Sequence, residues 1–224
     1  MTRLLIALLV IGWGCEPARV VVFVPPVVDV QRTPDTSRAV QVILSAEITW
    51  MGRAFGRQKQ YASGYVLANR GGWTYVVTCE HVTRFGVQPG MVATDDQLTV
   101  SGKPAHVWLL VVSRDLAVVR YASPTAVPLC TTAKAVLGQT AWACGWVAMG
   151  DDMPEYQLHT MRGYVAVTGR YIGHNAGLRA GFSGGPLLDS EGRVLGINRL
   201  MHGDSFGYAV PSRYLEAIIE SLPP

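Results

Sequence analysis

Short runs of apolar residues alternate with turn residues along most of this chain. In the first half, the runs with the composition of strands are 40–50, 60–68, 74–78, 97–100, 105–111 and 116–121. In the second half they are 140–146, 156–168, 186–189, 194–200 and 206–210. The segment 69–72 (Asn-Arg-Gly-Gly) has the composition of a hairpin turn. Many short strands at this spacing, with no long amphipathic helix between them, are typical of an all-β protein built of β-barrels.

The end of the chain follows a different pattern. Pro211 is followed by apolar residues at Leu215, Ile218 and Ile219, which recur with the spacing of one helix face. A proline at the first turn is also typical of a helix start. We therefore expect one C-terminal helix within 211–220.

Composition limits the classes of function that need to be considered. Of 224 residues, 49% are hydrophobic and 16% charged, with 24 Gly and 13 Pro, which fits one or two core-forming units with many turns. The net charge is only +3, and the arginines are scattered instead of clustered. We therefore expect no nucleic-acid partner.

The N-terminus has the pattern of a targeting segment. A short basic start is followed by the apolar run 4–11, which is too short to span a bilayer, and then by Gly14 and Cys15. This resembles a bacterial lipoprotein signal, so we expect 1–15 to be a signal peptide with lipidation at Cys15. The protein would then be exported to the periplasm or cell envelope and held at a membrane surface. A plain secretory signal peptide and an uncleaved apolar anchor are the alternatives.

Residues 16–38 form a segment rich in valine and proline. Its prolines block a regular helix or a central strand, which predicts an extended tether. The run 20–24 strongly favours a β-strand, so an extra edge strand is an equal alternative.

The segment 181–186 (Gly-Phe-Ser-Gly-Gly-Pro) is the strongest candidate for chemistry. Glycines on both sides of Ser183 permit a tight turn and leave space beside the hydroxyl. They also allow the amides of Gly181 and Ser183 to converge, and two such N–H groups can bind a tetrahedral oxyanion. An ordinary glycine-rich turn is the alternative.

Two upstream segments supply the partners that a nucleophilic serine needs. His81 is the second-last residue of the largely apolar run 75–82. Its imidazole is the usual base for activating a serine at neutral pH. Asp115 begins an apolar strand, an unusual place for a charge without a partner. Asp95 and Asp96, the other candidate acids, fall in a turn-like setting. The order His81, Asp115, Ser183 is that of triads on two-barrel folds, whereas nucleophile-elbow hydrolases have the order Ser, acid, His.

Together these segments resemble the trypsin/chymotrypsin-like serine peptidases, and most closely the bacterial HtrA/Deg branch. The matching segments are 62–67, 76–82, 115–119, 181–188, 192–198 and 208–212. The resemblance covers the chain from about residue 39 to its end. It implies a peptidase domain over 39–224 made of two six-stranded antiparallel β-barrels with a C-terminal helix. It also implies a serine endopeptidase without cofactor or metal, and we expect none of the PDZ domains common in that branch.

The resemblance also assigns roles to residues. Ser183 would attack the peptide carbonyl, His81 would transfer the proton, Asp115 would orient His81, and the amides of Gly181 and Ser183 would form the oxyanion hole. Phe182 stands where trypsin-like enzymes carry an aspartate, so activation through a freed N-terminus is not expected.

The segments that should bind substrate are 177–180, 198–201 and 206–208. Their candidate substrate-binding residues are Asn198, Arg199, Leu200, Phe206 and Tyr208. No acidic residue occurs in 177–180, so cleavage after small or medium apolar residues is expected. The strand 198–200 should pair with the substrate backbone. His174 and His202 flank these segments and are candidates for a minor substrate role.

The cysteines leave two questions open. Cys130 and Cys144 could pair across neighbouring strands or remain free thiols, depending on the geometry between them. Cys79 lies two residues before His81, where it is either a second candidate nucleophile or a small buried residue; the setting of Ser183 favours the latter. Two other functions are alternatives: a peptide-binding protein with an inactive peptidase fold, and an esterase that uses the same triad. The expected partner is a protein or peptide substrate.

Overall fold

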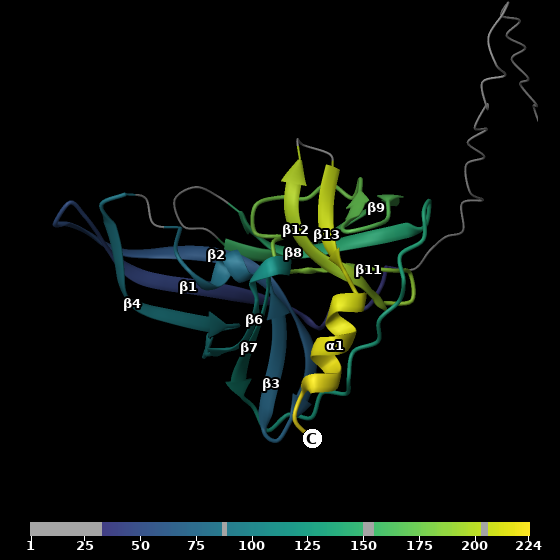
Figure 1. Cartoon of the computed structure of the whole chain (residues 1–224), viewed down its shortest axis with the longest axis horizontal. Helices are drawn as coiled ribbons and strands as arrows, with labels where there is room; N and C mark the ends of the chain where they lie inside the picture. Colours follow the sequence, from purple (N-terminus) through teal and green to yellow (C-terminus); the bar gives the residue numbers. More distant parts are fainter. Residues whose placement is uncertain (1–32, 87–88, 150–154, 203–205) are drawn as a thin grey trace, which may run out of the picture. The chain divides into compact units, whose positions relative to one another are not determined.

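The computed structural model describes residues 33–86, 89–149, 155–202 and 206–224 (Figure 1). The predictions for the signal peptide, for Cys15 and for most of the tether lie outside these residues. Residues from 33 onward belong to one compact unit. Among the described residues, no helix combines the length and apolar character needed to cross a membrane.

The first half of this unit is a seven-stranded antiparallel sheet that contributes one side of the candidate site. Its strand order is β5-β4-β1-β2-β3-β7-β6 (Figure 1). In that order the strands are Lys103–Pro104, Met91–Val100, Ala39–Trp50, Arg53–Arg70, Trp73–Thr78, Leu116–Ala122 and His106–Val111. Two short 3-10 turns, η1 (Glu80–Thr83) and η2 (Val112–Arg114), follow β3 and precede β7. Since β3 pairs with β7, Thr78 opposite Ala117, these two turns meet at the same end of the sheet.

The second half is a closed six-stranded barrel with the order β10-β13-β12-β11-β8-β9. In that order the strands are Ile172–His174, Phe206–Pro211, Val194–His202, Pro186–Leu188, Thr140–Met149 and Glu155–Val167. Helix α1 (Arg213–Ser221) follows β13 directly. It buries Leu215 and Ile218 and leaves Arg213 and Glu216 exposed, as its apolar spacing predicts.

Buried apolar residues of both halves form one continuous core. Tyr75, Leu67 and Leu116 from the first sheet pack in the same cluster as Ile197 and Leu215 from the second half. A second cluster around Phe182 and Leu195 fills the closed barrel. Phe182 is fully buried, so the residue before the candidate nucleophile anchors its loop in the barrel interior.

The predicted all-β architecture and the C-terminal helix are confirmed, with differences in the first half. The first sheet has seven strands, not six, and only the second half is a closed barrel in the described structure. Strand β2 begins at Arg53 instead of residue 60, because the exposed residues 53–59 are held by pairing with β1 and not by an apolar face. Asp95 and Asp96, expected in a turn, lie within β4 at a break in its pairing with β1, where Asp95 forms an ion pair with Arg57.

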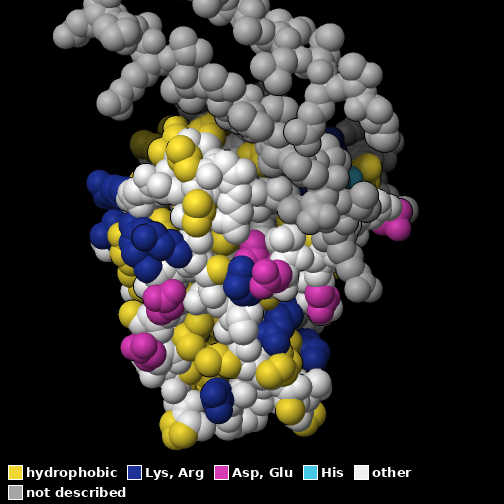
Figure 2. All heavy atoms as spheres, turned by 90° about the vertical axis from the view of Figure 1, so that its right-hand side faces the viewer, with side chains coloured by type: hydrophobic (Ala, Val, Ile, Leu, Met, Phe, Trp, Pro, Cys, Tyr) yellow, Lys and Arg dark blue, Asp and Glu magenta, His cyan; other side chains and the backbone are white. Residues whose placement is uncertain are grey.

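Charged side chains are mixed on the face drawn in Figure 2. Lys and Arg side chains lie among Asp, Glu and apolar residues, and neither positive nor negative charge dominates that view.

The three cysteines of the described residues, Cys79, Cys130 and Cys144, are buried free thiols. The bond considered between Cys130 and Cys144 is therefore not formed. Burial raises the pKa of Cys130 to about 11 and that of Cys144 to about 12, so both stay protonated at neutral pH.

Candidate active site

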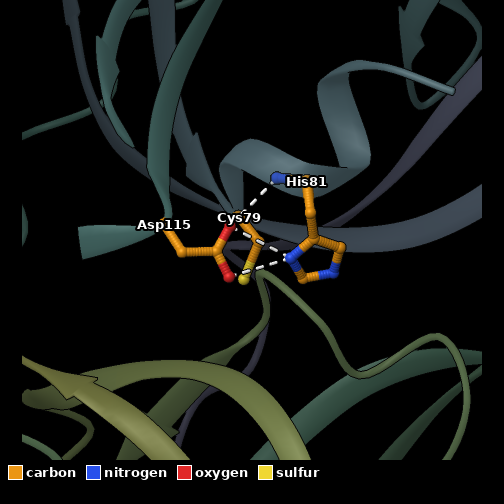
Figure 3. A group of neighbouring side chains, drawn as sticks. All are labelled: Cys79, His81 and Asp115. Carbon is orange, nitrogen blue, oxygen red and sulfur yellow. Dashed lines mark hydrogen bonds and ion pairs between the residues drawn. The ribbon is translucent and has the colours of Figure 1, made fainter. Parts of the chain in front are cut away.

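His81 and Asp115 form a hydrogen-bonded pair at the end of the first sheet (Figure 3). His81 lies in η1 and Asp115 at the end of η2, where its φ of 56° places it in the left-handed region. The ring Nδ1 of His81 lies 2.9 Å from Oδ2 and 3.0 Å from Oδ1 of Asp115. The backbone N–H of His81 also donates to Oδ1 at 3.0 Å. Because the carboxylate only accepts, Nδ1 carries the proton, and Nε2 is left as the basic nitrogen.

The Asp115 carboxyl is buried yet held in its charged form. Burial raises its pKa, but the bonds from the ring and amide of His81, and then the bond from Arg199, outweigh that effect and leave the pKa below its usual range. Nε of Arg199 lies 2.7 Å from Oδ2. The carboxylate therefore has a hydrogen-bond partner on each side.

Ser183 lies on the loop between β10 and β11, which backbone hydrogen bonds join both to β2 of the first sheet and to β12 of the second barrel. The carbonyl of Ser183 accepts from the N–H of Ser63 at 2.9 Å, and the N–H of Gly184 donates to the carbonyl of Asn198 at 2.8 Å. Gly184 has a φ of 85°, and a Cβ there would lie 2.2 Å from both the Ser63 carbonyl oxygen and Thr78 Oγ1. Only glycine fits between the loop and the first sheet at this point.

Gly181 is confined in the same way. Its φ is 97°, and a Cβ would lie 2.1 Å from the carbonyl oxygen of Trp146 in β8. Ser63 Oγ donates to the carbonyl of Gly181 at 2.7 Å, which fixes that peptide group. Within the described residues, the amides of Gly181 and Ser183 donate to no protein acceptor. Both predicted oxyanion donors are thus free to bind a ligand oxygen.

All three predicted triad side chains line one pocket of about 620 Å³. The lining residues are Glu80, His81, Arg84, Val112, Asp115, Leu178, Arg179, Ala180, Phe182, Ser183 and Arg199. In this state the hydroxyl of Ser183 donates to the carbonyl oxygen of Arg199 at 3.3 Å, a long bond. Hydrogen bonds between catalytic groups are often long or unformed without substrate.

The residues predicted to bind substrate take different positions. Arg199 lines the pocket, whereas Asn198 is fully buried and donates from Nδ2 to the carbonyl of Pro186 at 2.9 Å. Phe206 and Tyr208 pack edge to face at 5.3 Å and are not among the residues that line this pocket. For Leu200, the structure describes the backbone pairing with Tyr208 only.

Two residues have roles that the sequence reasoning did not assign. Arg199, which is predicted to contact substrate, also forms an ion pair with Asp115. Ser63 belongs to a matching segment but carried no role, and its hydroxyl joins the Gly181 loop to the N–H of Trp146 at 2.8 Å. The only sequence signal for the role of Ser63 is that it is a serine beside a glycine in a buried strand. No sequence signal points to the ion pair of Arg199.

Cys79 lies next to the His81–Asp115 pair but has the properties of a structural residue. Its side chain is fully buried, its Sγ donates to the carbonyl of Asn198 at 3.2 Å, and burial raises its pKa above the usual range. Ligand atoms of Cys79, His81 and Asp115 lie within 4.8 Å of one another (Figure 3), close enough for a metal ion. A metal would need the thiolate and would displace the bond between His81 and Asp115, so this arrangement fits proton transfer better than metal binding.

Comparisons with known proteins agree with this geometry. A family model described as a trypsin-like peptidase domain matches residues 62–197. The protein named Protease Do-like 1, chloroplastic, of Arabidopsis thaliana is 30% identical over 176 residues, which cover 71% of this chain and 38% of that protein. Putative serine protease HhoA of Synechocystis sp. is 29% identical over 199 residues, covering 77% of this chain and 47% of that protein. The chain thus spans less than half the length of these two relatives.

A solved structure is similar in fold. The serine endoprotease from Yersinia pestis superposes with a TM-score of 0.57 at 20% identity, covering 80% of this chain and 61% of that one. This likeness confirms the trypsin-like fold. With the family model matching more than half of its residues, the chain belongs to the trypsin-like serine peptidase family, with HtrA/Do-like proteases among its relatives.

Proposed function

We propose that this chain is a serine endopeptidase that cleaves peptide bonds through an acyl-enzyme, with His81, Asp115 and Ser183 as its catalytic triad. The observation that carries the proposal is the single pocket lined by the bonded His81–Asp115 pair and by Ser183. Membership of a peptidase family supports it independently.

The first half of the reaction forms the acyl-enzyme. Ser183 Oγ attacks the peptide carbonyl carbon while Nε2 of His81 takes the hydroxyl proton. The carbonyl oxygen becomes an oxyanion, which the amides of Gly181 and Ser183 bind. When the carbon–nitrogen bond breaks, His81 returns the proton to the leaving amine. Asp115 keeps the ring in the required tautomer and stabilises its charged form through the bond to Nδ1.

The second half releases the acyl group. A water molecule attacks the ester carbonyl and gives one proton to Nε2 of His81. Ser183 Oγ then leaves and takes that proton back, so the enzyme is regenerated and the product is a carboxylic acid. The same oxyanion donors act in both halves.

We further propose cleavage after small or medium apolar residues. Leu178, Ala180 and Val112 are apolar residues of the pocket lining. Its two acidic side chains already have cationic partners, Glu80 with Arg84 at 3.0 Å and Asp115 with Arg199. A lysine or arginine of the substrate would therefore enter without a free counter-charge, which is costly.

An activity probe tests the nucleophile most directly. A fluorophosphonate should label Ser183, and mass spectrometry should find the label on the peptide that contains it. Ser183→Ala should lose labelling and about a million-fold in kcat while its melting temperature is kept, because the triad acts as a unit. A folded Ser183→Ala protein with near-normal hydrolysis would exclude this triad. Labelling without casein cleavage would favour the esterase alternative, and no labelling would favour a peptide-binding protein.

A mixed peptide library tests the substrate preference. Cleavage should concentrate after Ala, Val, Leu or Met and discriminate loosely among them, since one methylene changes selectivity by only about 10- to 200-fold. A dominant preference for Lys, Arg or Glu at the cleaved position would contradict the proposal.

We also propose that the protein is exported and carries lipid at Cys15. The support is the N-terminal pattern alone: a basic start, an apolar run and a small residue before the cysteine. Intact-mass analysis of protein from a bacterial host should find a lipid-modified chain that begins at Cys15. A mature chain that begins after Cys15 without lipid would leave the plain secretory interpretation.

A further inference from the structure

Arg199 lies at a break in the pairing of β12 with β13. Asn198 pairs with Ala209 and Leu200 with Tyr208, so two steps along β12 correspond to one step along β13. A bulge of this kind leaves the extra residue unpaired and redirects its side chain. Here the extra residue is Arg199, and its side chain reaches from the second barrel to Asp115 at the end of the first sheet.

The contact of Arg199 with Asp115 competes with that of His81. Oδ2 of Asp115 lies 2.7 Å from Nε of Arg199 and 2.9 Å from Nδ1 of His81, so one oxygen serves both. The guanidinium also lies over the ring of Tyr171, 5.4 Å from its centre. With both contacts, the side chain is only 33% exposed. This partial burial reduces the screening of its charge by solvent.

The permanent positive charge of Arg199 on this oxygen changes how strongly the Asp115 carboxylate stabilises the charged form of His81. An aspartate alone would stabilise the positively charged imidazole ring, whereas an aspartate neutralised by arginine does so much less. The protonated ring cannot act as a base, so the strength of this stabilisation bears on the pH range of hydrolysis.

We propose that Arg199 is a positioning residue which, by pairing with Asp115, disfavours the protonated form of His81 and extends hydrolysis toward lower pH. This inference rests on the proposed function, because it concerns the base of that triad. Arg199 acts through Asp115 and needs no contact with the reacting atoms.

Other charged or titratable groups near the pair have their own partners or lie farther out. Cys79 is a buried thiol, and Glu80 pairs with Arg84. Arg114 lies over the ring of Tyr214, 4.3 Å from its centre, and Arg179 is exposed at the pocket. Among the described residues, Arg199 is the only cationic side chain that forms an ion pair with Asp115 besides His81.

The pH dependence of kcat/KM tests the proposal. In Arg199→Gln, the acid limb of the profile should move upward by about one pH unit relative to the parent protein. Arg199→Lys keeps the charge and should leave the limb within about 0.3 units of the parent. Arg84→Gln removes another guanidinium from the same pocket, but one that is 67% exposed and paired with Glu80. It should therefore move the limb by less than about 0.3 units.

A second measurement does not depend on hydrolysis. In the Ser183→Ala protein, NMR should detect the hydrogen-bonded Nδ1 proton of His81 and the pH at which the ring signals change. Adding Arg199→Gln should move that pH upward by about the same amount as the kinetic limb. If the parent hydrolyses no peptide, the proposed function fails, while the NMR comparison still tests the effect of Arg199.

Two results would overturn the inference. One is a folded Arg199→Gln protein whose ring signals and acid limb stay where they were or move downward. The other is an Arg199→Lys protein that shifts as far as Arg199→Gln, because the charge would then not be the cause. If Arg199→Gln fails to fold, Arg199→Met, which keeps an unbranched chain over Tyr171, takes its place and must show the same upward shift.

Discussion

The two halves of the candidate site are held together by different means. In the seven-stranded sheet, His81 and Asp115 are joined directly, through the ring and through the backbone N–H of His81. Ser183, on a loop of the closed-barrel half, is held by backbone hydrogen bonds of its loop to Ser63 and Asn198, and its hydroxyl is turned to the carbonyl of Arg199. The candidate base and acid are thus aligned by side-chain hydrogen bonds, whereas the candidate nucleophile is aligned by the close approach of glycines to neighbouring strands. Activity should therefore be lost in the first half when a substitution removes a side-chain hydrogen bond. In the second half it should be lost when a substitution adds a Cβ atom to a glycine.

Of the changes that separate the two halves, the largest effect should come from breaking the hydrogen bond between His81 and Asp115 in the first half. Asp115→Asn removes the charge and lets an amide group face Nδ1, which no longer fixes the required tautomer of His81. We expect kcat to fall by about ten-thousand-fold, the size known for this change in a triad. Peptide hydrolysis measured beside the melting temperature would check this. A folded variant with less than a tenfold loss would show that Asp115 is not the triad acid.

The second half should be broken by one added carbon. In Gly181→Ala the Cβ would lie 2.1 Å from the Trp146 carbonyl oxygen, so the loop must move. Displacing one oxyanion donor should lower kcat by about 100- to 1000-fold. Gly192→Ala is the matched control, since Gly192 has a φ of 78° but its nearest neighbour would be 3.9 Å away. It should lose about 1 kcal/mol of stability and keep its activity. Equal losses of activity in both variants would point to backbone strain and not to close approach.

The halves also differ in how they hold a titratable group. In the first sheet, bonds lower the pKa of Asp115, so its contribution is lost only as the pH falls below about 4. In the barrel, burial lowers the pKa of His174 to about 4. The unfolded chain therefore binds more protons than the folded one between about pH 6.5 and 4, and stability falls as the pH falls through that window.

This loss can be measured through His174. Over that window the parent protein should lose roughly 3 kcal/mol of unfolding free energy from this residue. Urea unfolding at both ends of the window should show a smaller loss in His174→Leu. His106→Gln, at an exposed position of β6, is the control and should behave as the parent. An unchanged pH dependence in His174→Leu would show that His174 is not the cause.

The smallest effect is expected at Cys79, which lies between the two halves. Its thiol is fully buried and donates to the Asn198 carbonyl. Cys79→Ala should cost about 1 kcal/mol of stability and change kcat by only a few-fold. Hydrolysis rates and thermal melts of Cys79→Ala and Ser183→Ala, measured side by side, separate the two candidate nucleophiles. A loss in Cys79→Ala as large as that in Ser183→Ala would make the thiol the nucleophile.

The strands were predictable where apolar residues alternate or run together. Runs 74–78 and 116–121 became β3 and β7 with small changes at their ends, because both are buried central strands. The long polar part of β2 and most of β4 were missed. Pairing with β1 holds these exposed residues in strands, and such pairing leaves no apolar pattern in the sequence.

The sequence by itself determined the family, the order of the candidate triad and the need for glycines around Ser183. These are local properties: a residue type, its neighbours and its place along the chain decide them. Only the tertiary structure decided that Arg199 pairs with Asp115 and that Asn198 is buried away from the pocket. A bulge in β12 directs Arg199 to a residue 84 positions earlier in the chain. Such a contact depends on how two sheets meet, and no spacing within either segment carries that information.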